Sequence, residues 1–130
     1  MNKIKYDFSQ MKFALVAHDN KKADMVAFVT KRLDFFNRED VDIVTTGTTG
    51  AHCEHAGITK VQKLLSGPLG GDAQIAALMC MEDLGALIFF VDPLSAHPHQ
   101  ADIDSLIRLC NCGNVIVCPN PTSAMSMMRE

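Results

Sequence analysis

Histidine and aspartate residues, which commonly carry protons in enzymes, gather in two polar segments of this chain. One is His18-Asp19-Asn20-Lys21-Lys22, and the other runs from Asp92 to His99, with Asp102 following it. A histidine beside a carboxylate can exchange hydrogen bonds with the carbonyl oxygen of a substrate while that carbonyl group becomes part of an enediolate. Asp72 is the candidate base for the proton next to that carbonyl, although a carboxylate at a helix start is also an ordinary cap. These residue types favour proton transfer at a carbonyl compound.

Two glycine-containing segments offer a place for a phosphate group. Thr46-Gly47-Thr48-Thr49-Gly50 combines hydroxyl groups with glycines whose backbone N–H groups can approach an anion. Ser66 to Asp72 holds four glycines or prolines, more than a plain turn requires. Neither segment matches a nucleotide-binding fingerprint, so a small phosphate monoester is favoured, with Lys22 as the candidate cation. A threonine cap without any ligand is the alternative interpretation.

A metal site is a weaker interpretation of the same residues. Asp92, His97, His99 and Asp102 lie in a proline-containing segment without the HxxxH spacing of a zinc-binding helix. The His52-Cys53-Glu54-His55 run lacks companion ligands and is interpreted as the polar surface of a short helix. We therefore predict that the chain binds no metal.

Five short apolar runs must position these polar segments. The predicted strands are Lys12–Ala17, Val41–Thr45, Val61–Leu65, Ala86–Val91 and Val115–Cys118. Apolar residues recur between them at helical spacing, as at Met25, Val26, Val29 and Leu33, or at Ile75, Leu78 and Met79, with the polar Glu82 continuing the latter spacing. The alternation predicts a single doubly wound α/β domain, Rossmann-like or flavodoxin-like, with about five parallel strands and helices on both faces. The polar segments follow strands, so they should meet at the carboxyl edge of the sheet, where such folds bind ligands.

Composition limits the chain to one domain, predicted over residues 11–130 after a polar tail over residues 1–10. A net charge of −3 without a long basic run argues against nucleic-acid binding. The longest apolar run, Ala86 to Val91, has six residues where a membrane-spanning helix needs about twenty, and no signal peptide is evident. Five cysteines without disulfide or zinc spacing predict reduced, mostly buried thiols in a cytoplasmic protein. The Met125 to Met128 run predicts terminal packing or a subunit contact.

Four motifs together resemble those of the methylglyoxal synthase family. They are Ala17-His18-Asp19 with Lys22, the Thr46 to Gly50 segment, the Ser66 to Asp72 segment, and Phe89 to Leu94 followed by Pro98-His99. They stand in the family's order and spacing, between about Lys12 and Pro121. The resemblance implies a Rossmann-like lyase that converts dihydroxyacetone phosphate to methylglyoxal and inorganic phosphate through an enediolate. It also implies a homohexamer without metal or organic cofactor.

The resemblance assigns roles to individual positions. Asp72 matches the family's catalytic carboxylate, and His18 and His99 match residues that meet the substrate oxygens. Asp102 joins these three as a predicted catalytic residue, while Asp19 and Asp92 match supporting acidic residues. The predicted substrate- and phosphate-binding set is His18, Lys22, Thr46, Gly47, Thr48, Thr49, Ser66, Gly67 and His99. Inorganic phosphate is expected as a product and as an inhibitor.

Two departures from the family pattern fall near these positions. Gln100-Ala101 stand where the family usually has an acidic residue and a proline, which bears on the geometry of His99 and Asp102. Longer members supply a basic residue to the phosphate from an extended tail, and Arg129 is the residue available here for that place.

A non-catalytic regulatory module is the alternative function. The same domain type resembles the effector-binding domain of large carbamoyl-phosphate synthetases. Such a module would keep the phosphate segment but would not need Asp72, His99 and Asp102 together, so their joint presence favours the enzyme.

Overall fold

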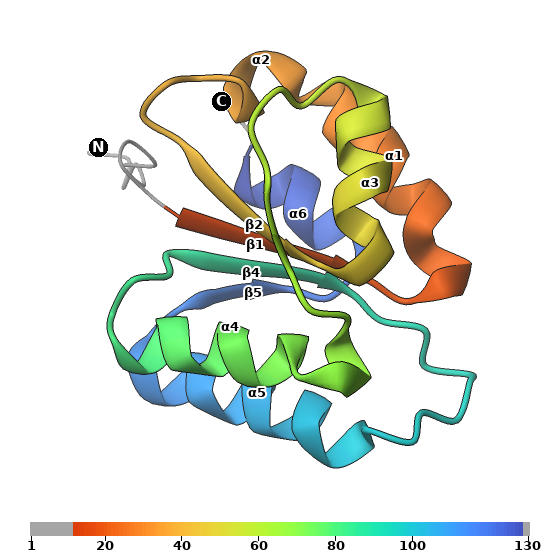
Figure 1. The fold of residues 1–130 in the computed structure, drawn as a ribbon, viewed down its shortest axis with the longest axis vertical. Helices are drawn as coiled ribbons and strands as arrows, with labels where there is room; N and C mark the ends of the chain where they lie inside the picture. Colours follow the sequence, from red (N-terminus) through yellow and green to blue (C-terminus); the bar gives the residue numbers. More distant parts are fainter. Residues whose placement is uncertain (1–11, 129–130) are drawn as a thin grey trace.

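The computed structural model describes residues 12–128, which form one five-stranded sheet with helices on both faces (Figure 1). The strands are β1 (Lys12–Ala17), β2 (Asp42–Thr46), β3 (Gln62–Leu64), β4 (Ala86–Phe90) and β5 (Ile116–Cys118). They are all parallel and lie in the order β3-β2-β1-β4-β5. The predicted doubly wound sheet of five parallel strands is confirmed, and its order is that of the first five Rossmann strands.

Within residues 12–128, six α-helices cover the two faces of the sheet. They are α1 (Lys22–Lys31), α2 (Leu33–Phe36), α3 (Gly47–Ala56), α4 (Gly71–Cys80), α5 (Gln100–Gly113) and α6 (Pro121–Met127). Short 3₁₀ turns, η1 (Asp19–Lys21) and η2 (Gly67–Leu69), precede α1 and α4. Figure 1 shows α4 and α5 on one face, and α1, α2, α3 and α6 on the other. Each face has its own hydrophobic cluster, as a parallel sheet covered on both sides requires.

Strand position in the sheet explains the burial of each apolar run. Every residue of the central strand β4 is buried, and β1 is buried after Lys12. The edge strand β3 instead exposes Gln62 and Lys63, because it pairs with only one neighbour and charged side chains protect an open edge. The predicted run from Val61 to Leu65 therefore shortens to three residues of strand.

One local prediction is wrong in detail. Glu82, grouped with the helical face of Ile75 and Met79, lies beyond the end of α4 at Cys80 and has φ +56°. The helix ends before it because the chain turns there toward β4. The Thr46 to Gly50 segment joins a strand to a helix, since β2 ends at Thr46 and α3 begins at Gly47.

The topological switch point lies between β1 and β4, from which the chain winds outward in opposite directions. The N–H of His18, the residue after β1, donates to the carbonyl oxygen of Phe90 at the end of β4 at 3.2 Å. This contact joins the two carboxyl ends at which the polar segments begin. The candidate site is therefore located where ligands bind in open α/β sheets.

The remaining sequence predictions concern the termini, the thiols and the membrane. The tail over residues 1–10 and Arg129 lie outside the described residues. Met128 is buried, and Met125 and Met127 pack against the core, as the packing interpretation expects. All five cysteines are unpaired; three are buried and two, Cys80 and Cys112, are exposed. No helix within residues 12–128 is long and apolar enough to cross a membrane.

Candidate active site

Three imidazole rings meet at the switch point. His18 follows β1, while His97 and His99 lie in the segment between β4 and α5. The rings of His18 and His97 stack with centroids 3.8 Å apart, and the ring of His99 lies edge-on to both, at 6.2 Å from His18 and 5.9 Å from His97. The structure therefore brings together His18 and His99, which the sequence assigned to substrate contact, and stacks His97 on His18.

His18 is held as a neutral ring with one defined tautomer. Its Nδ1 accepts the backbone N–H of Asp92 at 2.9 Å, so the proton of the neutral ring is on Nε2. Nε2 is buried and has no hydrogen-bond partner among residues 12–128. Burial, followed by repulsion from His97 and His99, lowers the pKa of His18 to about 4. The site thus presents an N–H donor that carries no positive charge at neutral pH.

Asp92 anchors the segment that supports these rings. Its carboxylate accepts hydrogen bonds from Ser95 Oγ at 2.6 Å, Asn20 Nδ2 at 2.9 Å and the Leu94 N–H at 3.1 Å. The hydrogen bonds from Ser95 and Asn20 lower the pKa of Asp92 to about 2. A carboxylate held by three donors is a poor proton acceptor, so Asp92 suits the supporting role predicted for it.

Asp72 is the buried carboxylate of the site. It lies in the first turn of α4 and is 3% exposed, and neither carboxylate oxygen has a hydrogen-bond partner in the described chain. His99 Nε2 is 3.6 Å from Asp72 Oδ2, close enough for charge attraction but longer than a hydrogen bond. Burial raises the pKa of Asp72, against the opposing attraction of His99. An unpartnered buried carboxylate of this kind is a candidate general base.

Glycines bring the backbone close to Asp72. A side chain on Gly71 would collide with the Leu65 carbonyl, its Cβ lying 2.0 Å from that oxygen, and Gly70 has φ +121°. The tight turn that these residues allow places Gly67 against the carboxylate. A methyl group on Gly67 would lie 3.1 Å from Asp72 Oδ1 and 3.3 Å from Oδ2. The glycines of this segment therefore allow the backbone to lie close to the Asp72 carboxylate.

The threonine segment contacts the same turn. The Gly47 N–H donates to the Leu65 carbonyl at 3.3 Å, and a Cβ on Gly47 would lie 3.0 Å from Ser66 Cβ. Thr46 is the residue before α3, but its side chain makes no capping hydrogen bond to the described helix. The first N–H groups of α3 therefore lack the side-chain cap that the ligand-free interpretation of this segment required. Such a helix start is suited to an anion.

The other predicted site residues differ in exposure. The Lys22 ammonium donates to the Ala17 carbonyl at 2.9 Å and to Asp19 Oδ1 at 3.0 Å, and this second hydrogen bond, together with the charge of Lys22, lowers the pKa of the exposed Asp19 carboxyl. Thr46 and Thr49 are buried, and Thr48 is exposed on α3. Asp102 is exposed in the first turn of α5, and its charge contributes to raising the pKa of Asp72.

Helix α5 begins beside the site despite the unusual residues at its start. His99 is the residue before the helix, and its carbonyl accepts the N–H of Asp102 at 3.0 Å. The side-chain amide of Gln100 donates a hydrogen bond to Asp104 Oδ1 at 3.0 Å, on the same helix. The helix therefore starts at Gln100 without a proline, and it keeps His99 and Asp102 in one turn.

The His52 to His55 run does not form a ligand cluster. His52, Glu54 and His55 are exposed on α3, whereas Cys53 is buried in the core and burial raises its pKa to about 12. Within residues 12–128, no three histidine, cysteine, aspartate or glutamate side chains are grouped so as to hold a metal ion.

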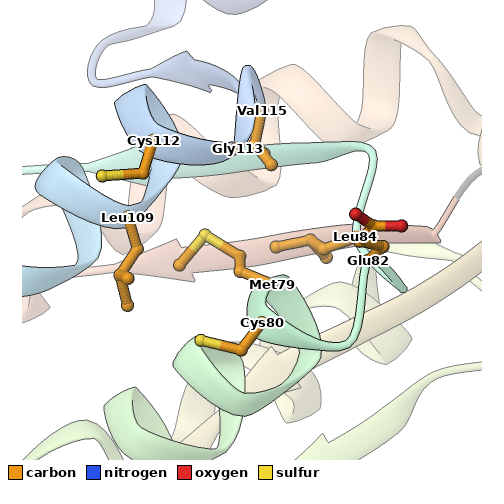
Figure 2. A pocket seen from close by; sticks show the side chains of 8 residues that line it. All are labelled: Met79, Cys80, Glu82, Leu84, Leu109, Cys112, Gly113 and Val115. Atoms are coloured by element: carbon orange, nitrogen blue, oxygen red, sulfur yellow. The ribbon is translucent and has the colours of Figure 1, made fainter.

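A separate hollow of about 420 Å³ lies between the carboxyl ends of α4 and α5, at the opposite ends of these helices from Asp72 and Asp102 (Figure 2). Its walls include Met79, Leu84 and Leu109, with the sulfurs of Cys80 and Cys112 on either side. It contains none of the predicted site residues.

Sequence reasoning assigned no role to three residues that shape the site. Asn20 and Ser95 hold the Asp92 carboxylate, and His97 covers the ring of His18. Each lies in a polar segment already singled out, so position in the sequence was a signal. Their contacts, however, join β1 and β4 across the switch point and follow only from the fold.

Comparison with known proteins decides the family. The family model described as the MGS-like domain matches residues 20–119. The chain is 47% identical over 120 residues to the methylglyoxal synthase of Carboxydothermus hydrogenoformans, covering 92% of this chain and 97% of that protein. This chain belongs to the methylglyoxal synthase family. It is therefore an enzyme of the lyase type, and the resemblance of the four motifs is confirmed.

Other methylglyoxal synthases agree in sequence and in structure. That of Bacillus subtilis is 43% identical over 119 residues, covering 92% of this chain and 85% of that protein. A crystal structure of methylglyoxal synthase from Elizabethkingia anophelis superposes with a TM-score of 0.81 at 34% identity, covering 94% of this chain and 80% of that one. The similarity to these methylglyoxal synthases thus covers more than nine-tenths of this chain.

Proposed function

We propose that this chain converts dihydroxyacetone phosphate to methylglyoxal and inorganic phosphate. The observation that carries the proposal is the pairing of a buried carboxylate without hydrogen-bond partners in the described chain, Asp72, with a neutral N–H donor, His18 Nε2. A base and an uncharged donor are the two groups that enolisation of a carbonyl compound requires. The names of the relatives supply the substrate class.

In the first step, the Asp72 carboxylate takes a proton from the hydroxymethyl carbon of the substrate. The electron pair of that C–H bond forms a C=C bond, and the carbonyl oxygen becomes the oxygen of an enediolate. His18 Nε2–H donates a hydrogen bond to this oxygen as its charge grows. In this proposal His99, whose Nε2 is 3.6 Å from Asp72 Oδ2, orients the carboxylate and contacts the neighbouring substrate oxygen. The raised pKa of Asp72 brings it nearer to that of a useful base.

In the second step, the enediolate expels phosphate from the carbon on the other side of the former carbonyl. The substrate hydroxyl loses its proton and becomes the aldehyde, while the C=C electrons form a new C=C bond to the carbon that carried the phosphate. The C–O bond breaks with its electron pair on the phosphate, which takes up the hydroxyl proton. The resulting enolate of methylglyoxal gains one proton at carbon from solvent, and Asp72 returns its proton to solvent. Expulsion requires the C–O bond to stand out of the enediolate plane, where it overlaps the π electrons. A phosphate group held in the enediolate plane would favour isomerisation, so the orientation in which the site binds the phosphate decides which product forms.

The proposed phosphate site is the start of α3 together with the Ser66-Gly67 turn. Support comes from the uncapped helix start, from the contact between Gly47 and Ser66, and from the contact between Gly67 and the Asp72 carboxylate. These contacts form a continuous path from the phosphate position to the base. The remaining binding residues that we propose are Lys22, Thr46, Thr48 and Thr49, with Asp102 as a further catalytic residue and Asp19 as the partner of Lys22.

The test is incubation of the purified protein with dihydroxyacetone phosphate, with methylglyoxal and phosphate measured in the same samples. The proposal predicts that both products appear, in equal amounts. Binding of phosphate without any turnover would contradict it and would instead support the regulatory-module function.

Inorganic phosphate is expected to inhibit competitively, because a site built for the substrate phosphate also holds the released product. Thr48→Ala should weaken this inhibition and raise the KM by about tenfold, as expected for the loss of one charge-assisted hydrogen bond. Thr59→Ala, on the exposed loop before β3, is the matched control and should change neither value. Inhibition by phosphate that is identical in the Thr48→Ala variant and the native protein would place the phosphate elsewhere.

Activity is expected to survive exhaustive chelation, because the described side chains offer no grouped metal ligands and the proposed steps need only proton transfer. The measurement compares turnover before and after dialysis against EDTA. Activity that is lost on dialysis and restored by one divalent metal would contradict this expectation.

We also propose that the protein assembles as a homohexamer in the cytoplasm. The names of the relatives do not state an assembly, and the resemblance to the family is the basis for this part. All five cysteines are free thiols, which supports the location of the protein in a reducing compartment. Light scattering should give a mass about six times the 14.2 kDa of one chain, and a concentration-independent monomer mass would contradict the assembly.

A further inference from the structure

His97 is an imidazole of the site that the proposed mechanism leaves unused. Its ring stacks on that of His18, with centroids 3.8 Å apart and planes inclined by 22°. Its Nε2 lies 3.0 Å from the backbone oxygen of Asp92. Because a carbonyl oxygen only accepts hydrogen bonds, His97 donates from Nε2. His97 is thus fixed to the same residue whose N–H binds His18.

We infer that His97 is a positioning residue that holds His18 as the neutral tautomer with its Nε2–H toward the substrate. The inference rests on the proposed function, in which that N–H contacts the carbonyl oxygen. Asp92 joins the two rings, since its N–H donates to His18 at 2.9 Å and its oxygen accepts from His97. A proton added to His18 Nδ1 would face the Asp92 N–H, replacing a hydrogen bond by a contact between two donors.

Burial and the neighbouring groups that shift the pKa of His18 lower it, with the Asp92 carboxylate as the exception. Burial lowers the pKa of His18 to about 4, and among the neighbouring titratable groups His97 lowers it most, by electrostatic repulsion. The Asp92 carboxylate opposes this effect but is itself occupied by Asn20 and Ser95. The titratable groups that face His18 are His97, His99 and Asp92 from the segment between β4 and α5, Asp19 from η1, and Lys22 from α1.

The test uses His97→Gln, which removes the titratable ring but keeps an N–H for the Asp92 oxygen. The first readout is the NMR titration of the His18 ring in the ligand-free protein, which should move to higher pH. Full return to the ordinary pKa near 6.5 would leave about one-tenth of His18 neutral at about pH 5.5. Because the ring remains buried, we expect about a threefold loss of kcat/KM relative to the native protein at that pH, and little loss at about pH 8.

Two further variants separate positioning from general disturbance of the fold. His97→Phe keeps the stacked ring but lacks both the titratable group and the donor, and it should also move the titration of His18 to higher pH. His55→Gln, at an exposed histidine near the end of α3, should leave the titration and the activity profile unchanged.

The two readouts distinguish failure of this inference from failure of the proposed function. An unchanged His18 titration in a folded His97→Gln protein would overturn the inference while leaving the activity in place. A shifted titration in a protein that never releases methylglyoxal would support the coupling of the two rings and overturn the proposed function.

Discussion

Asp72→Asn is expected to lower kcat by about 10²–10⁴, because the amide cannot accept the proton that a positioned carboxylate base removes. Shape and size are almost unchanged, so the Gly67 turn and the start of α3 should still bind phosphate. Turnover and the inhibition constant for inorganic phosphate, measured on one preparation, therefore separate chemistry from binding. A large loss of turnover with intact phosphate binding is the expected pattern.

Stability supplies the control for the Asp72 variant. Burial raises the pKa of this carboxyl, so its charged form costs folding free energy at neutral pH, and the neutral amide removes that cost. The melting temperature of Asp72→Asn should equal or exceed that of the native protein. Near-native turnover in the folded variant would show that Asp72 is not the base, and the base would then be sought at Asp102 or Asp19.

His18→Phe is expected to lower kcat by about 10²–10³, the usual effect of removing one donor to a developing oxyanion. Phenylalanine keeps a flat ring between His97 and Phe89, whose centroids lie 3.8 Å and 5.1 Å from that of His18, but it offers no N–H. The KM should change less than kcat, because the donor acts mainly on the charge that forms during the reaction. Steady-state kinetics at several pH values provide the measurement.

His18→Gln is the matched variant, since its side-chain amide retains an N–H donor and an acceptor. It should keep more activity than His18→Phe, although the amide is not held by stacking as the ring is. Equal losses in the two variants would contradict a donor role and would indicate that the imidazole acts by proton transfer or by packing alone.

The alternation of strands and helices along the chain and the layers of the fold followed from apolar runs that alternate with helical patterns, whereas the order of the strands in the sheet did not. Phe13 to Ala17 and Ala86 to Phe90 were the most predictable strands, because the central strands of a parallel sheet are buried on both faces. The strand at Gln62–Leu64 was the least predictable, since an edge strand carries polar residues and pairs on one side only. The end of α4 before Glu82 depended on a left-handed backbone conformation that residue types alone did not indicate.

The candidate site was predictable as a set of polar segments but not as a set of contacts. Asp72 could be named from its place at a helix start, whereas its burial and its lack of hydrogen-bond partners in the described chain come from the packing of Gly67. From the sequence alone, Asp92 could equally have been a proton donor, a metal ligand or a residue that anchors its segment by hydrogen bonds. The hydrogen bonds from Asn20 and Ser95 decide in favour of an anchor, and they connect segments that are distant in the sequence.

Reaction in D₂O, followed by phosphorus and proton NMR, tests most directly whether this site forms an enediolate and then expels phosphate from it. The account predicts that inorganic phosphate and methylglyoxal increase together in equal amounts, and that the methyl group of methylglyoxal carries one deuterium gained when the enolate becomes the ketone. Accumulation of an isomerised sugar phosphate without free phosphate, or methylglyoxal with no deuterium in its methyl group, would contradict the account.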